Sequence, residues 1–342
     1  MAIHSNTPEL LKSWLSTEGF SEKASIQLLL GDGSSRSFYR VQEPGSSESW
    51  ILLSDPEWTQ SQDYPAHQTA LLKVGLPVPS FKKMDPSQGL LLMQDLGDEL
   101  LQLRIQKEPS QKEGWLIKAT ELLGHLHGRL FPVPTDLPVS KRRFDTLKLF
   151  QECSFTLEHL REKFLGLAPL KDSERKAIEK FCGALDGFLP LVFCHRDYHC
   201  RNLLVHQNGL WMIDFQDARL GPPGYDLASL LFDAYLPISK EVRGQLISVY
   251  LKTLGSYPLA GKINLQTFEK ELYLLAYQRT LKAAGSFASF WTRFQKNTHL
   301  SYIEPALVLA RSIESAGLIP NDVTRAFEID NLIKRLHEKQ SN

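Results

Sequence analysis

The chain has 342 residues, enough for two domains or lobes that each bury a hydrophobic core. Its composition, 42% hydrophobic and 23% charged residues without a low-complexity tract, is ordinary for a globular protein. Lysine plus arginine equals aspartate plus glutamate at 39 each, so the basic excess typical of nucleic-acid-binding proteins is missing and no nucleic-acid partner is expected.

The cysteines and the apolar runs indicate the compartment. No C-x-x-C pair occurs, so neither a zinc site nor a redox motif is predicted, and four thiols are too few for a disulfide scaffold; they are Cys153, Cys182, Cys194 and Cys200. No apolar run approaches the ~20 residues of a membrane span, and residues 1–11 lack a basic-then-apolar signal pattern. We therefore expect a cytoplasmic protein with no membrane partner.

Residues 1–95 predict a small α+β unit. A helix is expected to begin at Thr7-Pro8-Glu9, with Thr7 as its cap and Pro8 at its first position. A second helical stretch, at about 66–74, ends at Gly75 and Pro77. Short apolar segments predict four strands, namely Ile26–Leu30, Phe38–Val41, Trp50–Leu53 and Leu90–Met93.

Residues 96–342 predict a larger and mostly helical unit. Apolar residues at helical spacing mark helices over Lys112–Leu130, Phe144–Leu165, Ser173–Phe188 and most of the chain from Asp226 to Arg335. Two short strands, Leu203–Val205 and Trp211–Ile213, flank the turn-forming Gln207-Asn208-Gly209. The chain therefore predicts two domains, residues 1–95 and 96–342.

One loop carries the residues of a phosphoryl-transfer site. His195-Arg196-Asp197 is followed by Asn202, and a strand, a turn and a second strand then lead to Asp214-Phe215. Kinase-type transfer needs one carboxylate to accept the proton of the attacking hydroxyl, and an amide and a second carboxylate to hold Mg²⁺. Because this order and spacing supply all three groups, we predict Asp197 as the base and Asn202 and Asp214 as metal ligands.

The same residues have a plainer interpretation, as polar loop residues between buried strands. An isolated H-x-D would favour that interpretation, whereas the complete pattern at this spacing is far more specific. His195 is expected to orient the loop through hydrogen bonds. Arg201 would either stabilise charge on the transferring phosphoryl group or form a salt bridge to Asp217 or another acid.

These motifs resemble those of the aminoglycoside phosphotransferase/choline kinase superfamily. H-R-D-Y-H-x-R-N, I-D-F-Q-D-A and G-P-x-x-Y-D-L are most similar to the bacterial kinases that phosphorylate N-acetylmuramate and N-acetylglucosamine at the anomeric hydroxyl during cell-wall recycling. The likeness runs from about Leu30 to Phe290 and includes Tyr277–Lys282. It implies a bilobal, protein-kinase-like α+β fold, with ATP and Mg²⁺ as cofactors and a small sugar as the substrate.

The resemblance also implies a nucleotide site in the first domain. Gly31, Asp32, Gly33, Ser34, Ser35 and Arg36 would form the turn over the phosphates, where small residues let backbone amides approach anions. Without the rest of the pattern, such a turn is most often a simple hairpin. Gln94, Asp95 and Leu96 would form the hinge, whose backbone meets the adenine edge.

Two residues of the second domain have both a structural and a functional interpretation. Asp226 is expected to cap a helix, and by family analogy to brace the catalytic loop. Arg279 would meet a substrate carboxylate or form a salt bridge.

The sequence departs from the protein-kinase pattern in one respect. It has no Lys or Arg between Val41 and Leu72 and no Glu between Trp58 and Asp98, so both members of the usual Lys–Glu pair are missing. Phosphate charge would then be met by Mg²⁺, loop amides and Arg36, Arg40 or Lys73. The same absence supports the alternative of a nucleotide-binding pseudokinase scaffold.

The acceptor is the least specified part of the prediction. Lys141–Leu165 contains six basic and four acidic residues, which favours a neutral or anionic sugar over a polycationic aminoglycoside. A choline-type kinase would need an aromatic cage, which Trp211, Tyr225, Phe287 and Trp291 could supply. An aminoglycoside or choline-type kinase therefore stays the alternative.

Overall fold

The computed structural model describes residues 8–29, 36–55 and 63–341. The chain divides into two compact units, one of Met1–Asp98 with Leu204–Ile213 and one of Glu99–Leu203 with Asp214–Asn342. The prediction had assigned residues 204–213 to the helical domain, whereas the contacts group them with the sheet-containing unit. Thr7, the expected helix cap, lies outside the described residues.

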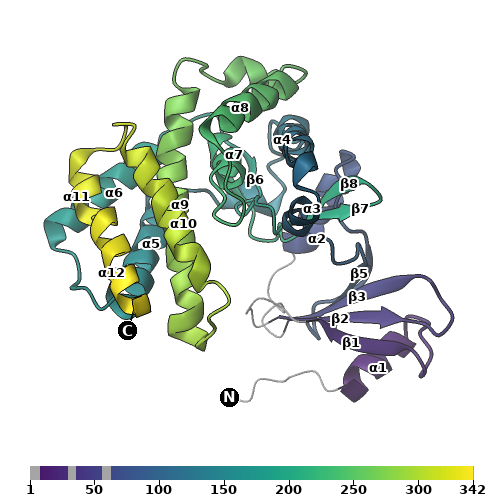
Figure 1. Ribbon diagram of the computed structural model, residues 1–342. Coiled ribbons are helices and arrows are strands. Elements are labelled where there is room, and N and C mark those ends of the chain that lie inside the picture. Colours follow the sequence, from purple (N-terminus) through teal and green to yellow (C-terminus); the bar gives the residue numbers. More distant parts are fainter. Residues whose placement is uncertain (1–7, 30–35, 56–62, 342) are drawn as a thin grey trace. The chain divides into compact units, whose positions relative to one another are not determined.

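The first unit contains a five-stranded antiparallel sheet with the order β1-β2-β3-β5-β4 (Figure 1). Its strands are β1 (Ser25–Leu29), β2 (Ser37–Gln42), β3 (Ser49–Ser54), β4 (Phe81–Asp85) and β5 (Leu90–Gln94). Four of them match the predicted segments within one or two residues. The edge strand β4 was not predicted.

One face of this sheet is covered by the first helix, α1 (Pro8–Ser16). The apolar residues of α1 and of the strands recur at the helical and strand periods, so they meet in one core of Leu11, Trp14, Leu15, Phe20, Val41, Leu52, Leu90 and Leu92. The predicted second helix is α2 (Asp63–Lys73).

The hairpin of β7 (Leu203–His206) and β8 (Gly209–Met212) forms at the predicted place. Gln207 and Asn208 have φ of 49° and 61°. Positive φ at both central residues is the mark of a tight two-residue hairpin turn, which keeps the ends of the two strands together. Asn202 immediately precedes this hairpin in the sequence, and Asp214 follows it after one residue, Ile213.

The second unit is built mostly of helices around α9 (Phe268–Phe294) (Figure 1). Its other α-helices are α3 (Leu101–Lys107), α4 (Lys112–Arg129), α5 (Thr146–Thr156), α6 (Asp172–Asp186), α7 (Gly224–Leu231), α8 (Lys240–Leu254), α10 (Ile303–Glu314), α11 (Asn321–Phe327) and α12 (Ile329–Ser341). The helix predicted over Phe144–Leu165 is divided, since α5 continues as a π-helix, η4 (Leu157–Phe164).

Short elements connect these helices. They are the 3₁₀ turns η2 (Pro109–Gln111), η3 (Pro138–Lys141), η5 (Pro258–Lys262) and η6 (Leu300–Tyr302), and an antiparallel pair of strands, β6 (Val192–Cys194) and β9 (Arg219–Gly221).

Helix α9 passes very close to α5 at Gly285. A Cβ added to Gly285 would lie 2.4 Å from Thr156 Oγ1 and 2.5 Å from Thr156 Cα, so only glycine fits there. Thr156 Oγ1 also donates a hydrogen bond to the carbonyl of Leu281 at 3.0 Å. These contacts fix α9 against α5, and they do so beside the residues of α9 that face the predicted catalytic loop.

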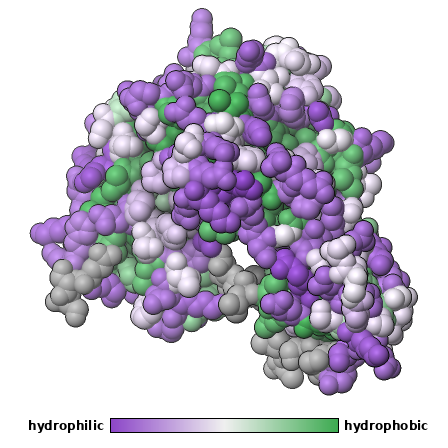
Figure 2. All heavy atoms as spheres, turned by 45° about the vertical axis from the view of Figure 1, so that its right-hand side comes forward, coloured by the Kyte–Doolittle hydropathy of each residue, from purple (hydrophilic) through white to green (hydrophobic). Residues whose placement is uncertain are grey.

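The surface carries no large apolar band on the face shown in Figure 2, where hydrophobic residues are interspersed among hydrophilic ones. The most exposed large apolar side chains among the described residues lie in separate parts of the sequence and include Leu28, Leu147, Leu189 and Leu265. Among the described helices, none is both long and apolar enough to cross a membrane.

Candidate active site

The predicted catalytic loop connects β6 to β7, and a buried tyrosine of the loop anchors it to α4. Tyr198 is fully buried, and its hydroxyl donates a hydrogen bond to the carbonyl of Ala119 in α4 at 2.8 Å. The His195 ring is also buried and packs edge-on against Tyr198. With these two rings inside, Asp197 between them keeps a quarter of its side chain exposed.

Asp226 braces this loop from α7. Its carboxylate accepts hydrogen bonds from the backbone amides of His195 at 2.6 Å and Arg196 at 2.9 Å. This confirms the expected bracing, but the expected capping was wrong: α7 begins at Gly224 after Pro223, so Asp226 lies inside its first turn. Its oxygens turn toward the loop because two orphan amides of the loop point at them.

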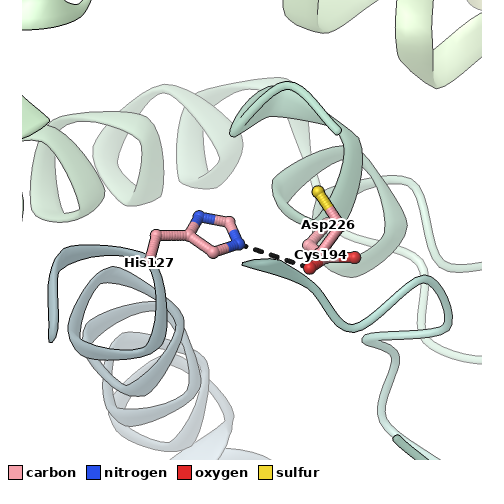
Figure 3. A group of neighbouring side chains, drawn as sticks. All are labelled: His127, Cys194 and Asp226. Atoms are coloured by element: carbon pink, nitrogen blue, oxygen red, sulfur yellow. Dashed lines mark hydrogen bonds and ion pairs between the residues drawn. The ribbon is translucent and has the colours of Figure 1, made fainter. Parts of the chain in front are cut away.

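His127 of α4 completes the bracing cluster, which Figure 3 shows with Cys194 and Asp226. One ligand atom from each of these three buried residues lies within 4.8 Å of the others, a spacing at which a metal ion could be held. The groups are however engaged otherwise: His127 Nε2 lies 3.3 Å from Asp226 Oδ2 and its Nδ1 lies 2.6 Å from the Tyr250 hydroxyl.

The Cys194 thiol is also unsuited to bind a metal. Burial, and then the charge of Asp226, raise its pKa well above the usual range, so it stays protonated, whereas a metal needs the thiolate. Cys194 donates to the carbonyl of Pro222 at 3.5 Å. We interpret the cluster as structural.

Two cations of α9 hold the carboxylate of Asp197. Arg279 Nη2 lies 2.9 Å and Lys282 Nζ 2.7 Å from Asp197 Oδ1. Burial alone would raise the pKa of Asp197, but the charges of Lys282, Arg279 and Arg196 lower it, and the pKa stays well below its usual range. Asp197 is therefore ionised at neutral pH. Arg279, a possible contact for a substrate carboxylate, forms instead the salt bridge that was its other expectation.

Asn202 and Asp214 are brought together as the spacing requires. Asn202 Nδ2 donates to the backbone carbonyl of Asp197 at 2.9 Å and lies 3.4 Å from Asp214 Oδ2. Asp214 is exposed and has φ of 65°, a left-handed conformation that is uncommon outside glycine. Gln216 Nε2 donates to Asp214 Oδ1 at 2.6 Å. Two adjacent oxygen-bearing side chains in contact with solvent are a donor set that suits Mg²⁺, which keeps several of its waters.

A buried glutamate, Glu152 of α5, was missed by the sequence analysis. It accepts hydrogen bonds from Tyr225 at 3.3 Å and Gln278 at 3.2 Å, and lies 3.4 Å from Arg196. Burial opposes its ionisation, but Lys282, Arg196 and Lys148 outweigh burial and lower its pKa. Nothing in the sequence near Glu152 marks it, because all the partners that explain it come from other helices and loops.

Arg201 lies against an aromatic wall of the second unit. Its guanidinium is 4.7 Å from the centre of the Tyr235 ring, and its Nη1 lies 3.2 Å from His299 Nε2. Asp217, one of the acids considered for it, lies 3.3 Å from Arg196. The role of Arg201 in charge stabilisation stays a prediction.

The predicted phosphate-binding turn is only partly described. Gly31, Asp32, Gly33, Ser34 and Ser35 lie outside the described residues. Arg36 forms a salt bridge with Asp55 at 2.8 Å. Arg40 binds Asp95 at 2.5 Å and Asp98 at 2.8 Å.

The predicted hinge is built around Asp95. Its side chain is 5% exposed and accepts hydrogen bonds from Arg40 and, at 2.7 Å, from Ser49 Oγ. Gln94 Oε1 accepts from the Ser80 backbone amide, and the Leu96 carbonyl accepts from His206 Nδ1 at 3.2 Å. The side chains of this segment therefore hold the first unit together, and the role of its backbone in adenine recognition stays a prediction.

Comparison with known proteins shows the family of this chain. Residues 26–260 match the Phosphotransferase enzyme family, and the chain belongs to that family. The N-acetylmuramate/N-acetylglucosamine kinase of Caulobacter vibrioides is 26% identical over 360 residues, covering 90% of this chain and 95% of that protein. The protein of the same name from Pseudomonas aeruginosa is 27% identical over 332 residues, covering 92% of each.

Solved structures share the fold at low identity. A choline/ethanolamine kinase family protein from Mesorhizobium loti is 14% identical with a TM-score of 0.60, covering 95% of this chain and 99% of that one. The aminoglycoside phosphotransferase APH(2″)-Ib, solved with ADP bound, is 14% identical with a TM-score of 0.56, covering 89% and 97%. The chain is thus a kinase-like phosphotransferase that acts on a hydroxyl group, and the predicted α+β fold is confirmed.

Proposed function

We propose that this chain uses ATP and Mg²⁺ to phosphorylate the anomeric hydroxyl of N-acetylmuramate or N-acetylglucosamine. The acceptor is supported by the names of relatives that match about nine-tenths of the chain. The anomeric position is the expectation that came with the family resemblance. We further propose that residues 1–95 form the nucleotide lobe, residues 96–342 the catalytic and substrate lobe, and that the protein acts in the cytoplasm.

One observation carries the proposed chemistry: Asn202 touches both other members of the site, at 2.9 Å from the Asp197 carbonyl and 3.4 Å from the Asp214 carboxylate. Asp197 would accept the proton of the sugar hydroxyl. Asn202 and Asp214 would hold Mg²⁺, which, when bound, neutralises charge on the phosphates. His195 would keep the loop oriented, and Arg201 would stabilise charge on the transferring group.

Other groups must bind the nucleotide phosphates in this chain, because the usual Lys–Glu pair is missing. We propose that the turn Gly31–Arg36 supplies backbone amides to the phosphates and that Gln94, Asp95 and Leu96 meet the adenine through their backbone. Arg36 and Arg40 each form a salt bridge with a carboxylate. Each arginine would have to break or share that salt bridge in order to contact a phosphate. Backbone amides and the metal are therefore the main proposed partners of the nucleotide.

The test is a panel of acceptors with purified protein. Mg-ATP is supplied with N-acetylmuramate, N-acetylglucosamine, a neomycin-class aminoglycoside or choline, and the product phosphate is located by ³¹P and ¹³C NMR. We expect a sugar 1-phosphate from at least one of the amino sugars and no product from the others. Removal of Mg²⁺ with EDTA is expected to abolish the product, and added Mg²⁺ to restore it.

The alternatives predict different results on the same panel. Phosphorylation of the aminoglycoside or of choline, without an amino-sugar product, would contradict the proposed acceptor. A nucleotide-binding pseudokinase would bind Mg-ADP in calorimetry but release no ADP from ATP with any acceptor. The second unit does contain the complete set Asp197, Asn202 and Asp214, which a scaffold would not require.

A further inference from the structure

Helix α9 directs two buried cations at the predicted base. Arg279 and Lys282 lie three positions apart, so they share one face of the helix. Their side chains are only 8% and 10% exposed, and both reach the same atom, Oδ1 of Asp197. Arg279 Nη2 also donates to Ser229 Oγ at 3.0 Å, which fixes its direction.

Stability alone does not account for this arrangement. Taking a charge out of water is costly, and a buried ion pair replaced by apolar residues of similar size is often no less stable. The carboxylate of Asp197 contacts two buried cations through Oδ1. A third cation, Arg196, has its Nε 4.0 Å from Oδ2 of the same carboxylate. Such an excess of positive charge around one anion is the pattern found where a group is held for chemistry.

The two oxygens of Asp197 are treated differently. Oδ1 accepts from Arg279 and from Lys282, whereas no donor among the described residues forms a hydrogen bond to Oδ2. Because a carboxylate with two strong donors on one oxygen cannot turn without breaking both, its second oxygen keeps a fixed direction. A quarter of the Asp197 side chain remains exposed, so an acceptor has access to it.

We propose that Arg279 and Lys282 are positioning residues that clamp Oδ1 of Asp197 and so present Oδ2 to the acceptor hydroxyl. This inference rests on the proposed function, since it takes Asp197 as the base. The hydroxyl proton passes to Oδ2 while the acceptor oxygen bonds to the γ-phosphorus. The bond from that phosphorus to the bridging oxygen breaks, and its electron pair leaves with ADP. Burial and the nearby charge of Arg279 lower the pKa of Lys282 to about 8, so Lys282 is mostly protonated at neutral pH.

Glu152 supports the clamp from behind. It is almost fully buried, and its negative charge interacts with both Lys282 and Arg196. Gln278, next to Arg279 on α9, donates to Glu152 at 3.2 Å. The clamp is thereby tied to α5 as well as to the loop, which restricts the motion of Asp197.

The experiment compares kcat and KM of Lys282→Met, Lys282→Arg and Arg279→Met with those of the unaltered chain, using Mg-ATP and N-acetylglucosamine. The expected loss in kcat is roughly 100-fold for each Met variant, the effect of a small misplacement of a reacting group. KM for ATP is expected to change little, and Lys282→Arg is expected to recover most of the rate. Lys270→Met, an exposed lysine of the same helix, is the matched control.

Other outcomes separate the inference from the proposed function. A folded Lys282→Met or Arg279→Met with near-normal kcat would overturn the clamp, as would a rise in KM for ATP that accounts for the whole loss. Folding is checked by thermal unfolding and by Mg-ADP calorimetry, and the two Met variants test the clamp independently of each other. Asp197→Asn is run beside them: if it stays active, the proposed base is wrong, whatever the clamp variants do.

Discussion

The carboxylate of Asp226 holds Arg196 in a conformation that arginine rarely adopts. Arg196 has φ of 81°, and its backbone amide donates to Asp226 Oδ1 at 2.9 Å. A non-glycine residue in this region costs about 1–3 kcal/mol unless its surroundings compensate. The strained residue immediately precedes Asp197, so the direction of the predicted base depends on an acid of α7.

Replacing Asp226 by Ala is therefore expected to weaken both the fold and the reaction. Two buried amides would lose a charged acceptor, which is expected to cost about 3 kcal/mol of unfolding free energy in urea. We expect kcat to fall at least tenfold because the loop relaxes. Asp330→Ala, which removes an exposed salt-bridge partner of Arg311, is expected to stay within about 0.5 kcal/mol. Equal effects of the two variants would contradict this role for Asp226.

The two acids bound to Arg40 provide a matched comparison in the first unit. Asp95 is 5% exposed and Asp98 is 74% exposed. Asp95→Ala removes the carboxylate that accepts hydrogen bonds from Arg40 and Ser49, and it is expected to lower the free energy of unfolding by about 2 kcal/mol. Asp98→Ala is expected to cost less than about 1 kcal/mol, since an exposed ion pair contributes little. Urea unfolding monitored by tryptophan fluorescence measures the loss of unfolding free energy in both variants. A larger loss for Asp98→Ala than for Asp95→Ala would show that burial does not determine how much each acid contributes to stability.

Gly285 tests how tightly α9 must pack. Alanine favours a helix over glycine by about 1 kcal/mol, but here its Cβ would meet the Thr156 backbone, and overpacking costs about 1–3 kcal/mol. We expect Gly285→Ala to be destabilising on balance and to lower kcat through the displaced clamp. Gly244→Ala in α8 is the control, because nothing lies within 4 Å of its added Cβ, and it is expected to stabilise the protein. A stabilising Gly285→Ala would contradict the close approach.

Glu314 gives a pH dependence of stability whose sign follows from its pKa. Burial raises the pKa of Glu314 above its usual value, although the hydrogen bond from Tyr277 at 2.6 Å opposes this. As the pH rises through the ordinary pKa of glutamate, the Glu314 carboxyl loses its proton in the unfolded chain before it does so in the folded chain. The folded state then binds more protons than the unfolded state, so stability falls as the pH rises. Glutamine does not titrate.

The stability of Glu314→Gln relative to the unaltered chain is therefore expected to increase as the pH rises above about 4, the ordinary pKa of a glutamate. The free energy of unfolding in urea at several pH values measures this difference. Glu269→Gln, which changes an exposed acid of α9, is the control. A constant difference for Glu314→Gln would show that its pKa is the same in both states.

Local sequence patterns predicted the helices and strands that have a regular apolar face buried in the core. Apolar spacing indicated α4 and the strands around Leu52 and Leu91, and the spacing of Asp197, Asn202 and Asp214 indicated a site before any contact was known. The edge strand β4 was missed because Lys82 and Lys83 interrupt its apolar pattern. Lys82 nevertheless packs its chain over the Trp50 ring, with its amine 4.8 Å from the ring centre.

Long-range electrostatics could not be predicted in the same way. Lys282 lies 85 positions from Asp197 and Glu152 lies 73 positions from Tyr225, and only the folded helices bring them together. Asp226 was predicted to be a helix cap because it follows the segment Gly221-Pro222-Pro223-Gly224, whereas the orphan amides of a distant loop determine where its oxygens point.

The most direct test of the proposed site is ADP release by Asp197→Asn and Asp214→Asn, with Mg-ATP and the acceptor found on the panel. Each change keeps the size of the side chain but removes the charge that the proton or the metal requires. We predict a loss of at least about 10³-fold for each, beside an unaffected Asp322→Asn control on the exposed side of α11. Near-normal ADP release by either folded variant would contradict its assigned role.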